Sequence, residues 1–359
     1  MNLFKQLKTL TETPAPSGFE HQIAPIIRDL WEPYVDEISL DRVGSLIALK
    51  KGQGKEPRPR ILIAAHMDEI GLMVSDIVEH NGQGFLRVTN LGGVDIRQLY
   101  AQLVTVHGKK DASGVMGCLP PPMLPKEKHH KPYDYEDLVV DLGLPIAEVK
   151  ANISIGNAVS FRQPLRKLMD KRVAGKSLDN RASIAAVSVC LEYLNGRSHD
   201  WDVVAVATAQ EETRLLGAFT TTYAQNPDAA IAIDVTFGKG PGADGDGTFE
   251  LGSGPVIERG PNVHPGMYEK LKETATDMEM KNSIGFHSRA SGTDAFGVQV
   301  ARAGIPTGLL SIPLRYMHTM VESINMKDVT RAGKLMGEFI ANLESNFVEK
   351  LTESMIEVE

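Results

Sequence analysis

The chain has 359 residues, 42% of them hydrophobic and 23% charged, a composition typical of a globular protein long enough for two domains. Its formal net charge of -8 at pH 7 argues against a nucleic-acid-binding protein, which normally carries a basic surface. The two cysteines are too few for a disulfide framework or a thiolate zinc site. No apolar stretch is long enough to predict a membrane span, and we expect a soluble, cytoplasmic protein.

Residues 1–72 begin with a predicted helix and continue with short strands. Leu3, Phe4, Leu7 and Leu10 recur at helical spacing and are interrupted by lysines, which indicates an amphipathic helix and not a signal peptide. Three apolar runs then predict strands, at Ile38–Leu40, Ser45–Leu49 and Ile61–Ala65.

Residues 73 to about 163 have a different hydrophobic pattern, without a long stretch of helical periodicity. Short alternating or apolar runs are separated by Gly, Pro, Asn and Asp, as in strands joined by turns. The predicted strands are Phe85–Thr89, Leu103–His107, Gly114–Leu119, Leu138–Leu142 and Ala158–Phe161. We interpret this segment as a small β-rich domain, PDZ-like or a barrel, inserted into a larger domain.

From residue 164 onward, predicted helices and strands alternate again. The strands are Val203–Ala209, Ala229–Ile233 and Thr307–Ser311, with a helix at 180–195 and a final helix from about Met326. This alternation predicts a mainly parallel sheet covered by helices on both faces. We therefore expect an α/β domain formed by residues 1–72 and 164–359, interrupted by the β-rich domain of residues 73–163.

Two polar segments predict loops. Lys126–Asp137 is dense in charge and predicts an exposed, mobile loop. Its residues His129 and His130 could bind a metal, but a solvated loop is the simpler interpretation. Gly240–Gly254 is rich in Gly and Asp and predicts a loop around one short strand.

Several familiar catalytic motifs are absent. Ala174–Ser177 ends like a phosphate-binding loop, but Asp170 stands where that motif needs its first glycine. The chain has no H-E-x-x-H, no G-x-S-x-G and no paired C-x-x-C. Single-metal protease and serine-hydrolase interpretations therefore lose their main support.

Histidines and carboxylates follow the predicted apolar strands, at or soon after the point where each strand ends. They are His66, the pair Glu211 and Glu212, Asp234 and His318, with Asp179 at the start of helix 180–195. Active sites of open α/β sheets form at the carboxyl ends of the strands, so these side chains are expected to converge.

Each residue also has a purely structural explanation. His66 could be a hydrogen-bonded structural histidine, and Asp179 could cap a helix; Asp234 could cap a turn and His318 could pack beneath the final helix. The adjacent carboxylates of Glu211 and Glu212 are different, because they repel each other unless a cation or a function holds them.

One shared metal site explains all of these positions together. Two histidines and three carboxylates, without cysteine, suit zinc, cobalt or manganese. Five ligands are too many for one tetrahedral ion but fit two ions that share a bridging carboxylate.

Spacing suggests further roles. Asp68 lies two residues after His66, so in extended chain both side chains point to the same face and Asp68 can orient the His66 ring. Glu211 and Glu212 are consecutive and must point in different directions. One can bind metal while the other takes a proton from a water beside the metals.

Six motifs occur in order along nearly the whole chain. They are HMDEIG at His66–Gly71, SLDNRAS at Ser177–Ser183, QEE at Gln210–Glu212, IDVT at Ile233–Thr236, SGTDA at Ser291–Ala295 and RYMHTMVES at Arg315–Ser323. Together they resemble the tetrahedral-type and glutamyl aminopeptidases, which are co-catalytic metallopeptidases of bacteria and archaea.

The resemblance implies two divalent ions per chain, zinc or cobalt first and manganese as an alternative. His66, Asp179 and Asp234 would bind one ion, and Asp179, Glu212 and His318 the other, with Asp179 as the bridge.

The resemblance also implies Glu211 as the general base and Asp68 as the residue that orients His66. The inserted domain would mediate assembly into a dimer and often into a hollow tetrahedral dodecamer.

We therefore expect a metal-dependent aminopeptidase that removes the N-terminal residue of peptides, with no nucleic-acid or membrane partner. The alternatives are a di-metal deacetylase or amidohydrolase, and an inactive scaffold, against which the intact Glu211 argues. Thr213–Ala218 and Thr319-Met320 depart from the usual family residues beside the site. The motifs contain no clear basic pocket, which favours a neutral, Leu-like N-terminal residue over an acidic one.

Overall fold

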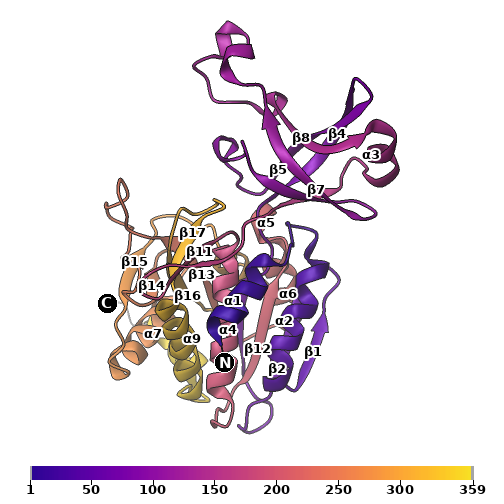
Figure 1. Ribbon diagram of the computed structural model, residues 1–359. Helices are drawn as coiled ribbons and strands as arrows, with labels where there is room; N and C mark the ends of the chain where they lie inside the picture. The colour runs from indigo at the N-terminus through magenta and orange to yellow at the C-terminus, as the bar shows by residue number, and fades with distance from the viewer. Residues whose placement is uncertain (1, 357–359) are drawn as a thin grey trace.

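The computed structural model describes residues 2–356 and contains an α/β domain with a closed β-barrel that stands above it in Figure 1. The α/β domain is built on one eleven-stranded sheet. In spatial order its main path is β1 (Glu37–Leu40), β2 (Leu46–Lys50), β12 (Asp202–Thr208), β3 (Arg60–His66), β13 (Ala229–Phe237), β16 (Thr307–Arg315), β17 (Glu322–Asn325), β11 (Arg172–Gly175) and β10 (Arg166–Lys167). Off this path, β14 (Val256–Arg259) pairs with β16, and β15 (Ser283–Phe286) pairs with β14.

The four central strands, β12, β3, β13 and β16, run parallel to one another, and the strands that flank them join antiparallel. In β3, Ile61 and Ile63 belong to one layer of the core, and Leu62 and Ala64 belong to the other. A strand buried on both faces must be continuously apolar. The predicted α/β fold is thereby confirmed, as a mixed sheet with a parallel centre.

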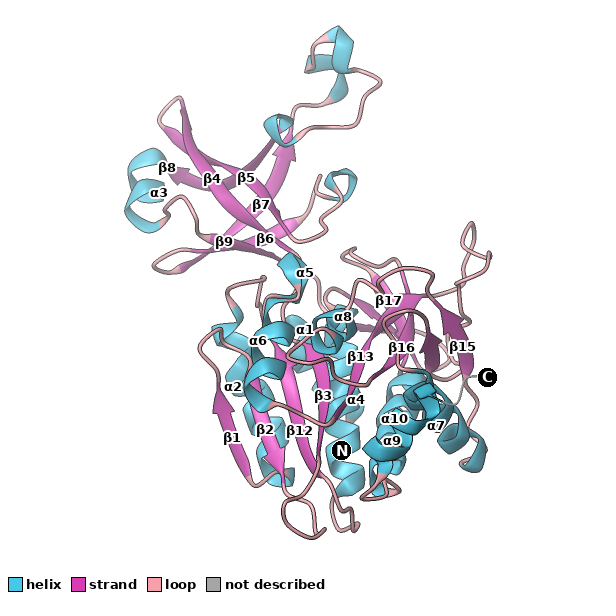
Figure 2. Cartoon of the chain, turned by 180° about the vertical axis from the view of Figure 1, so that it is seen from behind, coloured by secondary structure: helices cyan, strands magenta, loops and turns pink. Residues whose placement is uncertain are grey.

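Helices cover both faces of the sheet. The larger core layer packs beneath α1 (Leu3–Glu12), α2 (Ile23–Trp31), α4 (Leu178–Leu194), α7 (Pro265–Asp277), α9 (Met326–Ala341) and α10 (Phe347–Ile356). The smaller layer packs beneath α6 (Leu216–Gln225) and α8 (Asp294–Gln299), which Figure 2 shows from behind. The short helix α5 (Glu211–Arg214) connects β12 to α6.

The barrel is closed and antiparallel throughout. Its strands in order are β4 (Gly71–His80), β5 (Gln83–Leu91), β8 (Leu138–Pro145), β7 (Asp111–Cys118), β6 (Leu103–His107) and β9 (Ala158–Phe161). The helix α3 (Ile146–Asn152) packs against β5 and β8 and contributes Val149 to the barrel core. Alternate residues such as Val104, Val106 and Val159 fill the interior. Closure leaves no free sheet edge, and the predicted β-rich fold of this segment is confirmed as a barrel.

Single turns of 3₁₀-helix complete the described structure. They are η1 (Glu20–Gln22), η2 (Glu32–Tyr34), η3 (Ile96–Gln98), η4 (Pro121–Met123), η5 (Lys126–Lys128) and η6 (Tyr135–Asp137). The last two lie in the predicted loop Lys126–Asp137, which is mostly exposed and is tied across its base by an ion pair between Lys128 and Asp137 at 2.5 Å.

Two local predictions were wrong. The segment Gly240–Gly254 contains only isolated bridges and no strand, because several of its glycines adopt positive φ values that interrupt pairing. The helix that starts at Met326 is not the last, since it ends at Ala341 and α10 follows. Within residues 2–356, every helix is too short or too polar to cross a lipid bilayer.

Candidate metal centre

The register of the parallel strands brings the candidate site residues to one level of the sheet. β3 ends at His66, whose partner in β12 is Thr208, so Glu211 and Glu212 follow directly beside it. On the other side, Ala232 of β13 pairs with Ala64, which places Asp234 level with His66. Asp234 lies inside β13 and not after it, because that strand continues to Phe237.

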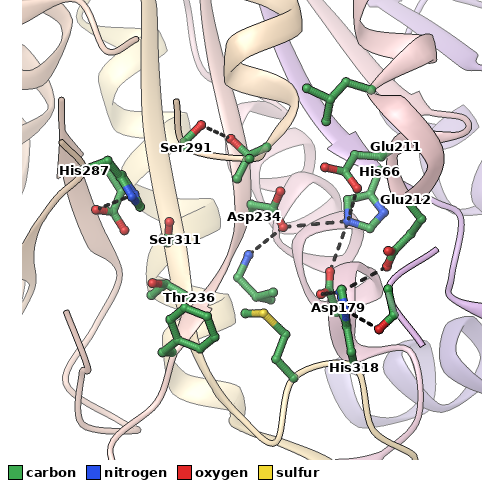
Figure 3. Close-up of a pocket in the computed structure, with 18 of the residues that line it drawn as sticks. His66, Asp179, Glu211, Glu212, Asp234, Thr236, His287, Ser291, Ser311 and His318 are labelled. Carbon is green, nitrogen blue, oxygen red and sulfur yellow. Dashed lines mark hydrogen bonds and ion pairs between the residues drawn. The ribbon is translucent and has the colours of Figure 1, made fainter. Parts of the chain in front are cut away.

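Asp179 and His318 reach the same place from other elements. Asp179 sits where α4 begins, with non-helical backbone angles, and His318 lies in the turn between β16 and β17. One oxygen of Asp179 is 3.1 Å from His66 Nε2, and the other is 3.3 Å from His318 Nε2. Asp179 thus lies between the two histidines, as Figure 3 shows.

Two groups of potential metal ligands result. His66, Glu211 and Asp234 offer atoms within 4.8 Å of one another, and so do His66, Asp179 and Glu212. His318 borders the second group, with its Nε2 3.6 Å from Glu212 Oε1. Glu211 is as close to His66 as Asp234 is, at 3.8 Å, so distance alone does not separate a base from a ligand here.

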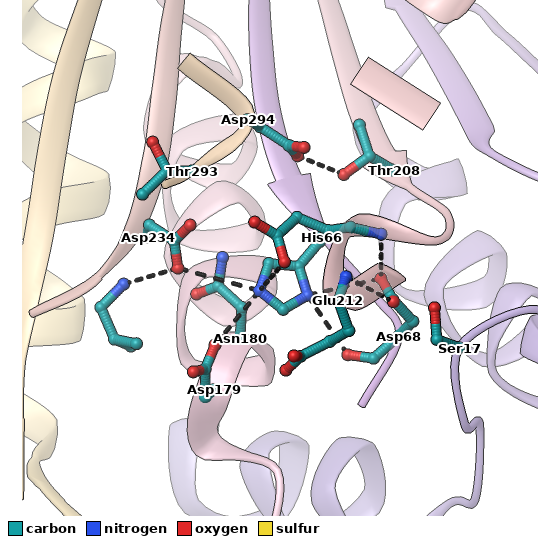
Figure 4. A network of polar contacts seen from close by, with 12 residues as sticks. Ser17, His66, Asp68, Asp179, Asn180, Thr208, Glu212, Asp234, Thr293 and Asp294 are labelled. Carbon is teal, nitrogen blue, oxygen red and sulfur yellow. Dashed lines mark hydrogen bonds and ion pairs between the residues drawn. The ribbon is translucent and has the colours of Figure 1, made fainter. Parts of the chain in front are cut away.

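Asp68 is fully buried and contacts three parts of the site. Its Oδ1 is 3.4 Å from His66 Nδ1, in the position from which a carboxylate orients a histidine ring. Its two oxygens also accept the backbone N–H groups of Glu211 and Glu212, at 3.0 and 3.1 Å. Asp68 therefore also caps α5, a contact visible in Figure 4 that the sequence did not predict.

Burial and mutual repulsion dominate the electrostatics of the carboxylates. Burial raises the pKa of Asp234 well above its ordinary value, and the charge of Asp179 adds to this. Burial also raises the pKa of Glu211 well above its ordinary value, and that of Glu212 to about 7. These groups are costly as anions unless positive charge lies between them.

The two histidines respond in the opposite sense. Burial disfavours their charged forms, but the carboxylates around them raise the pKa of His318 to about 9 and that of His66 well above its ordinary value. These nitrogen and oxygen donors lie close together and include no lysine or arginine. Such a group of donors is suited to binding divalent cations.

Two buried carboxylates beside the centre were missed in the sequence. Glu322, on β17, accepts the backbone N–H of Asp179 at 3.0 Å and that of His318 at 2.9 Å. Asp294, at the start of α8, accepts the hydroxyl of Thr208, and burial raises its pKa to about 6. Both belong to the recognised motifs, but neither follows an apolar strand, the feature that marks most of the candidate ligands.

A cavity of about 680 Å³ opens from the metal centre. Figure 3 shows Thr236 and Ser311 between the metal-centre residues and His287. The volume of this cavity lies in the range of small-molecule binding sites. Glu211 borders both the cavity and the ligand group, so it can reach a reacting molecule bound there.

Comparison with known proteins identifies the family of this chain. Residues 44–335 match the model of the M42 glutamyl aminopeptidase family. The lysyl aminopeptidase of Pyrococcus furiosus is 35% identical, over 94% of this chain and 96% of its own.

Solved structures give the same result. An aminopeptidase from the archaeon Desulfurococcus kamchatkensis is 33% identical, with a TM-score of 0.88 and 97% of each chain covered. The TET1 peptidase of Pyrococcus horikoshii, described as assembling into a tetrahedron or a large octahedral shell, is 29% identical with a TM-score of 0.82, covering 95% of this chain and 100% of its own. Because the family model matches most of its length, this chain belongs to the M42 glutamyl aminopeptidases. It is a metal-dependent peptidase hydrolase.

Proposed function

We propose that the protein is a two-metal aminopeptidase in which His66, Asp179, Glu212, Asp234 and His318 are the ligands. The position of Asp179 is the observation that carries this proposal, because its two oxygens face two histidines at 3.1 and 3.3 Å. A carboxylate placed in this way could be shared by two ions, as a two-metal site requires. Zinc or cobalt suits these donors best, and manganese is the alternative.

The metals supply one part of the chemistry: divalent ions in such a site lower the pKa of a water molecule and polarise a carbonyl oxygen. Glu211 supplies the proton transfer. It takes a proton from the attacking water and delivers it to the leaving amine, for which its place beside both the ligands and the cavity suits it.

Asp68 and Glu322 position these groups without touching the substrate. Asp68 holds the start of α5 and the His66 ring, and Glu322 holds the backbone of Asp179 and His318. With four backbone N–H groups bound to two buried carboxylates, the ligand segments keep their geometry when a substrate enters.

The barrel supplies the contacts between subunits in this proposal. Its strands lie between Gly71 and Phe161, and they contribute none of the proposed ligands. We propose that the chain assembles through it into a dimer or a tetrahedral dodecamer, in keeping with the shells described for the TET1 peptidase of Pyrococcus horikoshii.

The deciding experiment is to load metal-free protein with zinc, cobalt or manganese and assay a panel of aminoacyl p-nitroanilides together with their N-acetylated forms. An aminopeptidase cleaves the free amides and spares the acetylated ones. Release of acetate from the acetylated compounds, without cleavage of the free amides, would instead indicate a deacetylase. The names of the relatives do not indicate which N-terminal side chain is preferred, because the family is named for glutamyl residues and one relative for lysyl residues.

A further inference from the structure

Glu258 lies across the cavity from the metal centre. It belongs to β14, where Val256 pairs with Ser311 of β16, and Ser311 pairs in turn with Asp234 of β13. Glu258 and the metal ligands therefore line the same cavity, with β16 between them. None of the recognised motifs contains Glu258, and the proposed reaction does not use it.

The carboxylate of Glu258 is buried and only half satisfied. Its side chain is 1% exposed, and its Oε2 lies 3.3 Å from His287 Nε2, a pairing that raises the pKa of His287. Its Oε1 has no hydrogen-bond partner among residues 2–356. A buried carboxylate oxygen without a donor is costly, so this oxygen is suited to a donor that arrives with a ligand.

The fold makes room for this carboxylate. Gly285 lies opposite Glu258 in the β14–β15 pair, and a Cβ atom at Gly285 would collide with the carboxylate. Aromatic side chains line the approach: Phe237 and Phe286 are 61% and 70% exposed, and Phe249 lies beside them in the cavity wall. Such a wall accommodates a long alkyl stem and attracts a cationic end group.

We propose that Glu258 forms the end of the subsite for the side chain of the N-terminal residue, and that it selects lysine and arginine. This inference rests on the aminopeptidase function proposed above. The ammonium or guanidinium group donates to the free Oε1 of Glu258 while the alkyl stem lies against the phenylalanines. A basic preference differs from the neutral one expected from the motifs, because the selecting group lies outside those motifs.

Other charges in the cavity favour the same choice. Away from the metal centre, Arg214 and His287 are the described cavity residues that could attract an acidic side chain. Arg214 is exposed to solvent, which weakens its attraction. His287 is already paired with Glu258. An acidic side chain that reached the far end would meet the buried carboxylate of Glu258 and be repelled.

The test compares lysyl and norleucyl p-nitroanilides on the metal-loaded enzyme, because these substrates share the alkyl stem and differ at its end by the ammonium group. We expect kcat/KM to favour lysine by at least about tenfold, or about 1.4 kcal/mol. Glu258→Gln should bring the two substrates to within about twofold of each other, through loss of lysine cleavage with norleucine cleavage retained.

Asp246→Asn is the matched control, since Asp246 lines the same cavity but is exposed. This variant should keep the lysine preference. The inference is overturned if the parent enzyme cleaves norleucyl amide as well as lysyl amide, if Glu258→Gln lowers both equally, or if Asp246→Asn removes the preference as fully. If no free aminoacyl amide is cleaved at all, the proposed function itself fails, and the inference fails with it.

Discussion

Glu211 and Glu212 occupy consecutive positions in α5, but their carboxylates face different neighbours. Glu212 lies 3.6 Å from His318, whereas Glu211 lies 3.8 Å from His66 and groups with Asp234. Asp68 accepts both of their backbone N–H groups and so fixes the backbone from which the two side chains point in different directions. Identical side chains can therefore do different work at this site.

Glu211→Gln should retain both metal ions and lose most turnover. Proton transfer by a positioned base contributes about 10²–10⁴-fold, so kcat should fall by at least ~10²-fold. Glu212→Gln should instead lose metal from one site and recover some activity in excess zinc or cobalt. Kinetics and elemental analysis of both variants check this. Metal loss in Glu211→Gln would show that the two roles are exchanged.

Glu322→Gln tests a positioning role. The amide has one acceptor oxygen and would point its NH₂ group at a backbone N–H of Asp179 or His318. We expect metal affinity to fall about 10- to 100-fold, with kcat restored at saturating metal. Titration of the metal-free variant measures this, and Glu250→Gln, at an exposed position, is the control. Unchanged metal affinity would mean that the hydrogen bonds of Glu322 serve only the fold.

At the scale of elements, α5 is held between two residues with positive φ, Gln210 and Leu215, each at 58°. Behind it, Gly217 packs against the backbone of Ala209 so closely that an added Cβ would lie 2.5 Å from the Ala209 carbonyl oxygen. The helix that carries Glu211 and Glu212 therefore depends on a glycine at the start of α6.

Gly217→Ala should lower the free energy of unfolding by about 1–3 kcal/mol, because the methyl group has no room and the backbone must shift. The shift would move Glu211 and lower kcat as well. Chemical denaturation measures the first effect. Gly245→Ala is the control, since an added Cβ there meets nothing within 4 Å. Equal stability of the two variants would contradict the packing argument.

At the scale of the whole molecule, the metal centre joins segments from β3, α4, α5, β13 and the turn before β17. Bound cations would offset the repulsion between its buried carboxylates, and a ligand that binds only the folded state stabilises it. We expect two divalent ions per chain by elemental analysis, loss of activity with a chelator, and a lower melting temperature without metal. Active protein that holds one ion or none would contradict the two-metal proposal.

Assembly is the other property of the whole molecule. Leu103 and Val115 form a cross-strand pair on the barrel surface and are 52% and 46% exposed, with Tyr100 and Leu119 similarly exposed nearby in sequence. Exposed apolar side chains gathered in this way are typical of a surface that another subunit covers.

The double variant Leu103→Lys and Val115→Glu should dissociate the assembly without unfolding the barrel, because opposite charges are tolerated as a cross-strand pair. Light scattering should show an oligomer for the parent protein and a smaller species for the variant. Leu40→Lys, at an exposed position of the α/β sheet, should leave the assembly intact. A parent protein that is strictly monomeric would refute the assembly proposal.

The sequence alone determined the buried central strands and the ligand candidates. Strands such as Ile61–Ala65 are buried on both faces, so their apolar composition marks them, and a His or carboxylate at their ends then stands out. Tertiary structure alone decided what lies beside these residues. The two bonds of Glu322, the capping of α5 by Asp68 and the place of Glu258 across the cavity all depend on segments distant in sequence. Local patterns report burial and periodicity, whereas such contacts arise only when strand register brings distant segments to one level of the sheet.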